Sequence, residues 1–151
     1  MTDYTKIKQQ LYQNCLEFVD ERLNTVTNIM DSNKKALFSE TKSSAGDKHE
    51  TGRAMLQLEM EKASQQLTSI NQMKGVLQKL TIDYNSDIIS LGSLIVTDKA
   101  NYFLAISIGK ITIDSSDYYA VSTNSPIGKQ LLGKHIGEVI PFNNAEILDI
   151  F

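Results

Sequence analysis

The side chains capable of nucleophilic or metal chemistry are few in this sequence. It holds one cysteine, Cys15, and two histidines, His49 and His135. A single cysteine forms no disulfide within the chain and supplies no cysteine-rich zinc site. A Cys–His nucleophilic pair needs its two groups in contact, and Cys15 lies in a strongly helical polar stretch with no evident route to either histidine. The G-x-S-x-G elbow of serine hydrolases is also missing, so the sequence favours no nucleophilic enzyme.

Two carboxylates, Asp47 and Glu50, lie with His49 in a polar segment. This segment, residues 40–52 (ETKSSAGDKHETG), holds Ala45 as its one apolar residue. Taken alone, an aspartate beside a glycine is typical of a turn, and Glu50 is placed to stabilise the start of a following helix. His49 has the chemistry of a ligand or a proton shuttle, although an exposed histidine in a turn is more often neither.

The residues on either side of the polar segment have the spacing of a helical hairpin. Apolar side chains recur there at intervals of three and four residues, as in the a and d positions of a narrow coiled-coil seam. The first set is Leu16, Val19, Leu23, Val26, Met30 and Leu37, and the second is Leu56, Met60, Ala63, Leu67, Ile70, Leu77 and Leu80. Asn33 interrupts the first set and Lys74 the second. This spacing predicts two long antiparallel helices over residues 1–82, with a polar tip near 40–52.

Residues 83–151 differ in composition and predict a small sheet domain. They hold both prolines and five of the eight glycines, and they are rich in the β-branched residues that suit strands. A linker is expected near residues 82–87. Strands are expected at residues 93–96, 102–108, 110–113, 118–122, 138–142 and 146–150. The predicted fold class is therefore α+β.

A short helix is expected between the fourth and fifth of these strands. Ser125 suits the N-cap, Pro126 the first helical position and Gly133 the C-terminal stop. The helix would make about two turns. Its inward-facing side chains are expected to be Ile127, Leu131 and Leu132.

Charge and hydropathy argue against three further classes. The 15 basic and 18 acidic side chains give a net charge of −3, too mild for general nucleic-acid binding through a basic face. No apolar run approaches the roughly 20 residues that span a bilayer. The N-terminal MTDYTKIKQQ also lacks the apolar core of a secretory signal. We therefore expect a cytoplasmic protein with no membrane partner.

Two motifs carry a family resemblance that covers nearly the whole chain. The longer runs from Asn124-Ser125-Pro126-Ile127 through Leu131-Leu132-Gly133-Lys134 and continues in Ile136-Gly137-Glu138-Val139. The shorter, Gly46-Asp47-Lys48-His49-Glu50, is similar to a G-D-x-x-E pattern and falls where the heptads place the tip. In their spacing and order, the motifs resemble the bacterial Gre transcript-cleavage (transcription elongation) factors, GreA/GreB-like.

The resemblance implies an FKBP-like fold for residues 83–151, which docks on RNA polymerase while the hairpin enters the secondary channel. It implies that Asp47 first and Glu50 second help to hold a catalytic Mg²⁺ shared with the polymerase and to activate water. Hard carboxylate oxygens suit Mg²⁺, and a second metal stabilises the attacking and leaving oxygens at a phosphodiester.

By the same resemblance, the chain is not an enzyme by itself but a stimulator of the polymerase's own cleavage of backtracked RNA. We expect no intrinsic cofactor, a monomer, and only indirect contact with nascent RNA.

The residues after Glu50 depart from the family pattern. The cleavage factors usually continue with Asn, then another acid, then an aromatic residue, whereas this chain continues Thr51-Gly52-Arg53-Ala54. An acidic position of the family has become basic Arg53, and the aromatic residue is missing. Cations such as Arg53 lower the pKa of nearby carboxyls and also repel Mg²⁺. A Gre-like regulator of polymerase that does not cleave therefore stays open. A self-associating coiled-coil structural protein also stays open, because a and d seams pair between chains as well as within one.

Overall fold

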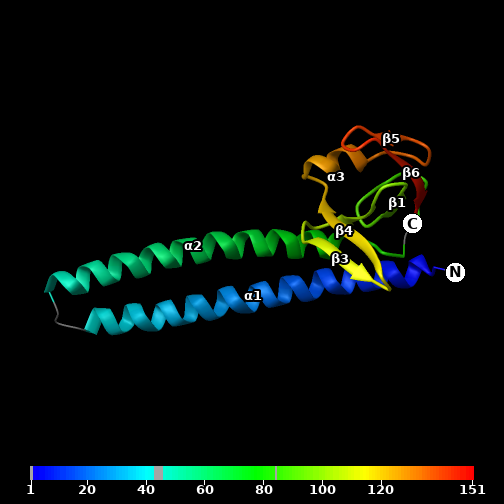
Figure 1. The fold of residues 1–151 in the computed structure, drawn as a ribbon. Coiled ribbons are helices and arrows are strands. Elements are labelled where there is room, and N and C mark those ends of the chain that lie inside the picture. The colour runs from blue at the N-terminus through cyan, green and yellow to red at the C-terminus, as the bar shows by residue number, and fades with distance from the viewer. Residues whose placement is uncertain (1, 43–45, 84) are drawn as a thin grey trace. The chain divides into compact units, whose positions relative to one another are not determined.

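The computed structural model describes residues 2–42, 46–83 and 85–151. Two long helices come first in the chain, and the strands of a sheet follow, with one short helix between two of them in sequence (Figure 1). In chain order the elements are α1 (Tyr4–Lys42), α2 (Gly46–Lys79), β1 (Leu94–Thr97), β2 (Asn101–Ala105), β3 (Gly109–Ile113), β4 (Ser116–Ser122), α3 (Pro126–Leu131), β5 (Val139–Ile140) and β6 (Ala145–Ile150). This arrangement confirms the predicted α+β class with an N-terminal helical hairpin, whereas the FKBP-like detail stays a prediction.

Contacts within the chain divide it into two compact units. One unit comprises Met1–Phe18 and Gly75–Phe151, so the start of α1 and the end of α2 belong with the sheet; we call it the sheet unit. The other comprises Val19–Lys74, and we call it the hairpin unit. The domain boundary predicted between residues 82 and 83 stays a prediction.

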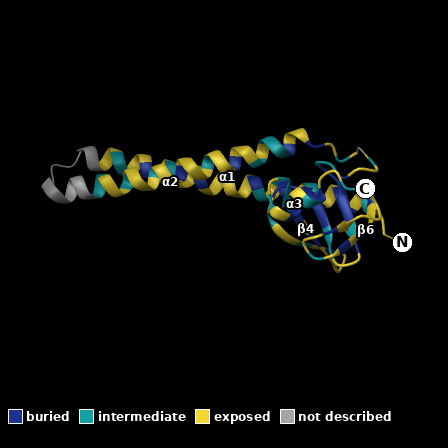
Figure 2. Ribbon diagram, turned by 90° about the horizontal axis from the view of Figure 1, so that it is seen from above, coloured by how far each residue is buried: buried dark blue, intermediate teal, exposed yellow. Residues whose placement is uncertain are grey.

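In the hairpin unit, α1 and α2 bury the faces that the heptad spacing predicts. The most buried apolar side chains recur at heptad positions of both helices, as the dark blue turns of Figure 2 show. They are Val19, Val26, Ala63 and Ile70, each at most 5% exposed. Gln, Lys, Glu and Leu, which have high helix propensity, dominate the remaining positions. The seam is narrow, as expected of two helices that pack only on each other.

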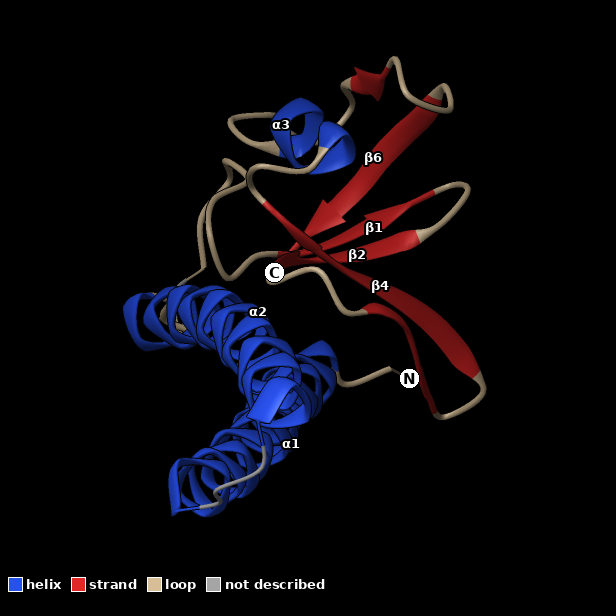
Figure 3. Ribbon diagram, turned by 90° about the vertical axis from the view of Figure 1, so that its left-hand side faces the viewer, coloured by secondary structure: helices blue, strands red, loops and turns tan. Residues whose placement is uncertain are grey.

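The sheet unit is built on a six-stranded mixed sheet in the order β3-β4-β2-β1-β6-β5. Strands β2 and β4 pair in parallel, with Phe103 opposite Ala120, and the other neighbours pair antiparallel. Figure 3 shows the strands crossing with the usual twist and α3 lying beside β6. The core on the α3 side gathers side chains from four strands, α3 and the segment before β1. It comprises Ile89, Ile95, Tyr102, Leu104, Ile127, Leu131, Ile140, Ala145, Ile147 and Ile150, with Ala100 and Val121 packed against it.

Helix α3 has the predicted start and stop. Ser125 is its N-cap, and Gly133 adopts a φ of +84° just beyond its end. Ile127 and Leu131 face the core as expected, but the prediction that Leu132 faces inward is wrong, since 47% of it is exposed. The helix ends at Leu131, and the backbone of Leu132 is extended (ψ 127°), so the inward face does not continue. Gly128 is buried in its stead.

The strand predicted over residues 138–142 is shorter than expected. The strand covers only Val139–Ile140, because the N–H of Glu138 closes a turn on the carbonyl of His135, although the Glu138 carbonyl still accepts from Ile147 of β6. On the other side, Pro141 has no N–H to offer a partner strand. The N–H of Phe142 donates instead to the side-chain oxygen of Gln130, at 2.7 Å.

Candidate functional site

The predicted tip carboxylates, Asp47 and Glu50, fall within the bounds of α2. The side chains that the structure describes run up to Ser39 and begin again at Gly52. Those of Asp47, Glu50 and His49 therefore lie outside them. The magnesium site predicted there stays a prediction. Among the side chains that are described, no group of three or more His, Cys, Asp or Glu converges on a position that could hold a metal ion.

The one cysteine is built into the packing of α1 rather than into a reactive site. Cys15 is fully buried. Burial raises the pKa of its thiol to about 12, so the thiol stays protonated at neutral pH. Because the thiolate is the nucleophilic form, this burial disfavours Cys15 as a nucleophile.

Two tyrosines in the first turns of α1 contact residues that are distant in the sequence. The ring of Tyr4, in the first turn of α1, stacks on the ring of Phe151 with centroids 4.3 Å apart and planes 20° from parallel. The hydroxyl of Tyr12 donates to the carbonyl of Leu77 in α2, at 3.1 Å. Sequence reasoning missed these positioning residues, since nothing local in the sequence signals a contact between the two ends of a chain.

A buried cation lies in the same region of α1. Lys8 is only 2% exposed. Burial lowers the pKa of its ammonium, and the negative charge of Asp83 opposes that shift. A buried lysine is uncommon because desolvating a charge is costly. Burying Lys8 therefore costs stability, and the negative charge of Asp83 offsets part of that cost.

The motif around α3 is fixed by hydrogen bonds of its own residues. The Ser125 hydroxyl accepts from the N–H of Gly128 at 3.0 Å and donates to the carbonyl of Ser122 at 2.7 Å. A Cβ added at Gly128 would lie 1.8 Å from that same carbonyl oxygen. The serine and the glycine of Ser125-Pro126-Ile127-Gly128 are thus needed to shape the strand-to-helix turn, and this is a structural role.

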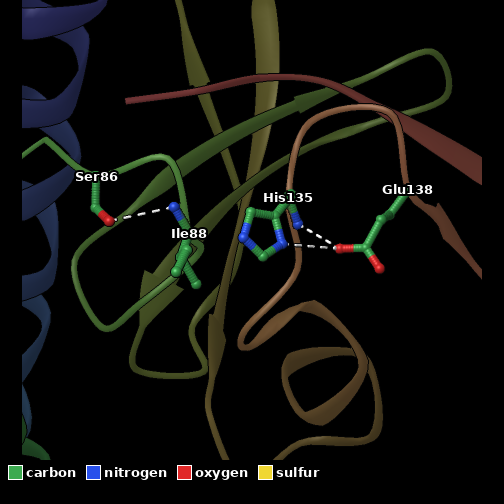
Figure 4. Close-up of polar contacts among 4 residues, drawn as sticks. All are labelled: Ser86, Ile88, His135 and Glu138. Carbon is green, nitrogen blue, oxygen red and sulfur yellow. Dashed lines mark hydrogen bonds and ion pairs between the residues drawn. The ribbon is translucent and has the colours of Figure 1, made fainter.

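The residues after α3 pair with the segment that follows α2 (Figure 4). Ile88 and His135 form an isolated antiparallel bridge, and the N–H of Ile88 donates to the hydroxyl of Ser86 at 3.2 Å. The N–H of His135 donates to the Glu138 carboxylate, whose Oε2 lies 3.4 Å from Nδ1 of the same histidine. The backbone hydrogen bond, followed by the side-chain contact, lowers the pKa of the Glu138 carboxyl. These contacts order the turn after α3, and we assign them a structural role.

The chain is similar to a protein of Alkaliphilus oremlandii (strain OhILAs) named transcription elongation factor GreA. The two are 30% identical over 77 residues, which cover 47% of this chain and 48% of that protein. The chain thus spans about half the length of the curated relative that it matches. No protein-family model matches the chain. The comparison supports a Gre-like relationship over about half the sequence.

Within residues 2–42, 46–83 and 85–151, every helix is too polar or too short to cross a bilayer.

Proposed function

We propose that this chain is an RNA polymerase-binding transcription elongation factor of Gre type. The observation that carries the proposal is the partial match to a protein named transcription elongation factor GreA. Two further features support it: a long helical hairpin precedes a small sheet, and a G-D-x-x-E pattern occurs near the expected end of the hairpin.

In this proposal the hairpin enters the secondary channel of the polymerase and presents Asp47 and Glu50 to the active site. Their carboxylates would contribute oxygen ligands to a Mg²⁺ shared with the polymerase, which supplies Lewis-acid chemistry at the phosphodiester. The polymerase then cuts its own backtracked RNA, so this chain stimulates the reaction without catalysing it alone. It carries no cofactor of its own, and it contacts nascent RNA only through that site.

The sheet unit serves as the anchor in this proposal. A hairpin that buries a narrow seam cannot hold its base in place alone. The Tyr4–Phe151 stack and the Tyr12–Leu77 hydrogen bond join the start of α1 to the sheet unit's last residue and to α2. These contacts would hold the start of α1 and the end of α2 within the sheet unit, which docks on the polymerase as a monomer.

The test uses a halted, backtracked elongation complex from the same host, with Mg²⁺ and the full chain. RNA is resolved on a gel, and polymerase binding is followed by co-elution. The variant is Asp47→Ala with Glu50→Ala. Its matched control is Glu59→Ala with Glu61→Ala, which removes two exposed carboxylates from the same helix.

We expect RNA shortening with the parent and the control, and at least about a hundredfold less with the tip variant, which still co-elutes. If the tip variant cleaves as the parent does, the assignment of Asp47 and Glu50 is wrong. If the parent neither shortens RNA nor co-elutes, the proposed function itself is wrong.

A second candidate is a Gre-like regulator that occupies the same channel without promoting cleavage. The observation that favours it is Arg53, a cation where the cleavage factors carry an acid. It predicts co-elution and altered pausing with intact RNA. It also predicts that Arg53→Glu, which restores the acid, raises cleavage. Cleavage by the parent chain would rule this candidate out.

A further inference from the structure

The outer part of the hairpin unit differs from the inner part in what its seam buries. In the described stretches 27–39 and 52–62, Asn33 is the only residue that is buried, with 7% exposed. The apolar seam residues of these stretches are only half-buried, namely Met30, Leu37, Leu56 and Met60. The inner stretches, 19–26 and 63–70, instead bury apolar side chains at both of their ends.

The Nδ2 of Asn33 is buried without a hydrogen-bond acceptor in the part of the chain that the structure describes. A buried N–H donor in this state has lost its water without gaining an acceptor, so it opposes the closed form. Val26, two turns earlier on α1, is 4% exposed and favours the closed form through its apolar surface.

The outer stretches do meet, but their apolar side chains remain largely in water. Ile29 of α1 lines one shallow hollow together with Glu59 and Ala63 of α2. Ile29 is 41% exposed, and the nearby Leu58 of α2 is 55% exposed. Separating the helices here would therefore expose little additional apolar surface.

We propose that Asn33 makes the outer hairpin a local opening unit, in which residues 27–39 and 52–62 separate while the inner seam and the sheet unit stay folded. Opening rehydrates the amide and gives up only half-buried contacts. Its free energy therefore lies below that of opening the inner seam. The device allows the helix segments next to the polar residues 40–52 to part and reclose. It concerns the hairpin itself and does not depend on the proposed function.

Amide hydrogen exchange on the full chain, read by mass spectrometry of peptides, tests this inference. The variant is Asn33→Leu. The matched control is Asn28→Leu, which makes the same change at an exposed position of α1 and so shares any gain in helix propensity. Asn33→Ala is a second variant, which removes the amide without adding volume in case leucine is too large for the seam.

We expect Asn33→Leu to slow exchange in residues 27–39 and 52–62 by about tenfold relative to Asn28→Leu, and Asn33→Ala to slow it by about threefold. Exchange in β1 and β2 should not change. Equal rates in the Asn33 and Asn28 variants would overturn the inference, as would uniform slowing across the chain. Slowing that appears only at high protein concentration would also overturn it, because self-association would then be the cause.

Discussion

In the sheet unit, core side chains pack against several elements, whereas in the hairpin unit they pack against one facing helix. The core of the sheet unit draws on strands, linker and α3, and it includes residues with no exposed surface such as Ile95, Leu104 and Leu131. The hairpin unit has one seam between two helices, with few fully buried apolar side chains. Since apolar burial is the main favourable contribution to folding, we expect the sheet unit to hold most of the stability and the hairpin unit to hold less.

Two glycines of the sheet unit offer the sharpest way to probe its packing. At Gly128 an added Cβ would meet the Ser122 carbonyl oxygen at 1.8 Å, whereas at Gly75, inside α2, it would meet nothing within 4 Å. We expect Gly128→Ala to lower the free energy of unfolding by about 3 kcal/mol or more, since backbone must move. Gly75→Ala should raise it by about 0.5–1 kcal/mol through helix propensity. Urea denaturation followed by circular dichroism measures both, and equal effects would contradict the geometry of the α3 turn.

Truncating one buried apolar side chain in each unit tests the contrast itself. Leu131→Ala, in the sheet unit, should cost about 2–4 kcal/mol in global unfolding, because the side chain is fully buried. Val26→Ala, in the hairpin unit, should cost only about 1–2 kcal/mol and act mainly on hydrogen exchange of the hairpin amides.

Leu132→Ala is the control for this pair. Its side chain is 47% exposed, so the change in stability should stay within about 0.5 kcal/mol. A Val26→Ala loss as large as that of Leu131→Ala, seen in global unfolding, would show that the two units unfold together.

The smallest expected effect concerns Lys8 and its pH dependence. Burial lowers the pKa of Lys8 below its ordinary 10.5, so the unfolded chain holds this proton more tightly than the folded one. The contribution of Lys8 to stability should therefore rise as the pH rises from the folded pKa toward 10.5. Lys8→Met should be neutral or stabilising by up to about 1 kcal/mol at pH 7.

The measurement is the difference in unfolding free energy between the parent and Lys8→Met, by urea titration at several pH values. The difference cancels the other groups that titrate at alkaline pH. A rise in the unfolding free energy of the parent relative to that of Lys8→Met as the pH increases agrees with the expected sign, and a fall contradicts it.

Much of the fold follows from local patterns. The three- and four-residue spacing predicts the buried faces of both long helices, because helix periodicity decides which side chains share a face. Ser125, Pro126 and Gly133 predict α3 because capping and backbone freedom act over a few residues. The predictions fail at Glu138 and Leu132, where the backbone turns at a residue that the apolar pattern does not mark. Helix α3 ends at Leu131, and the N–H of Glu138 closes a turn on the carbonyl of His135.

The candidate site residues also form two groups, those known only from the sequence and those whose contacts the structure describes. The tip carboxylates Asp47 and Glu50 are predictions from the sequence alone, since their side chains lie outside the described residues. The Ser125 motif is a different case, because the hydrogen bonds to Ser122 and Gly128 give it a structural role.

By itself, the sequence determined the α+β class, the heptad seam, the ends of α3 and the resemblance to Gre factors, because each depends on periodicity or on residues close together in the chain. The tertiary structure alone decided that Tyr4 stacks on Phe151, that Lys8 is buried and that the amide of Asn33 has no acceptor. These features depend on which distant segments exclude water from a side chain, and that exclusion exists only once the chain has folded.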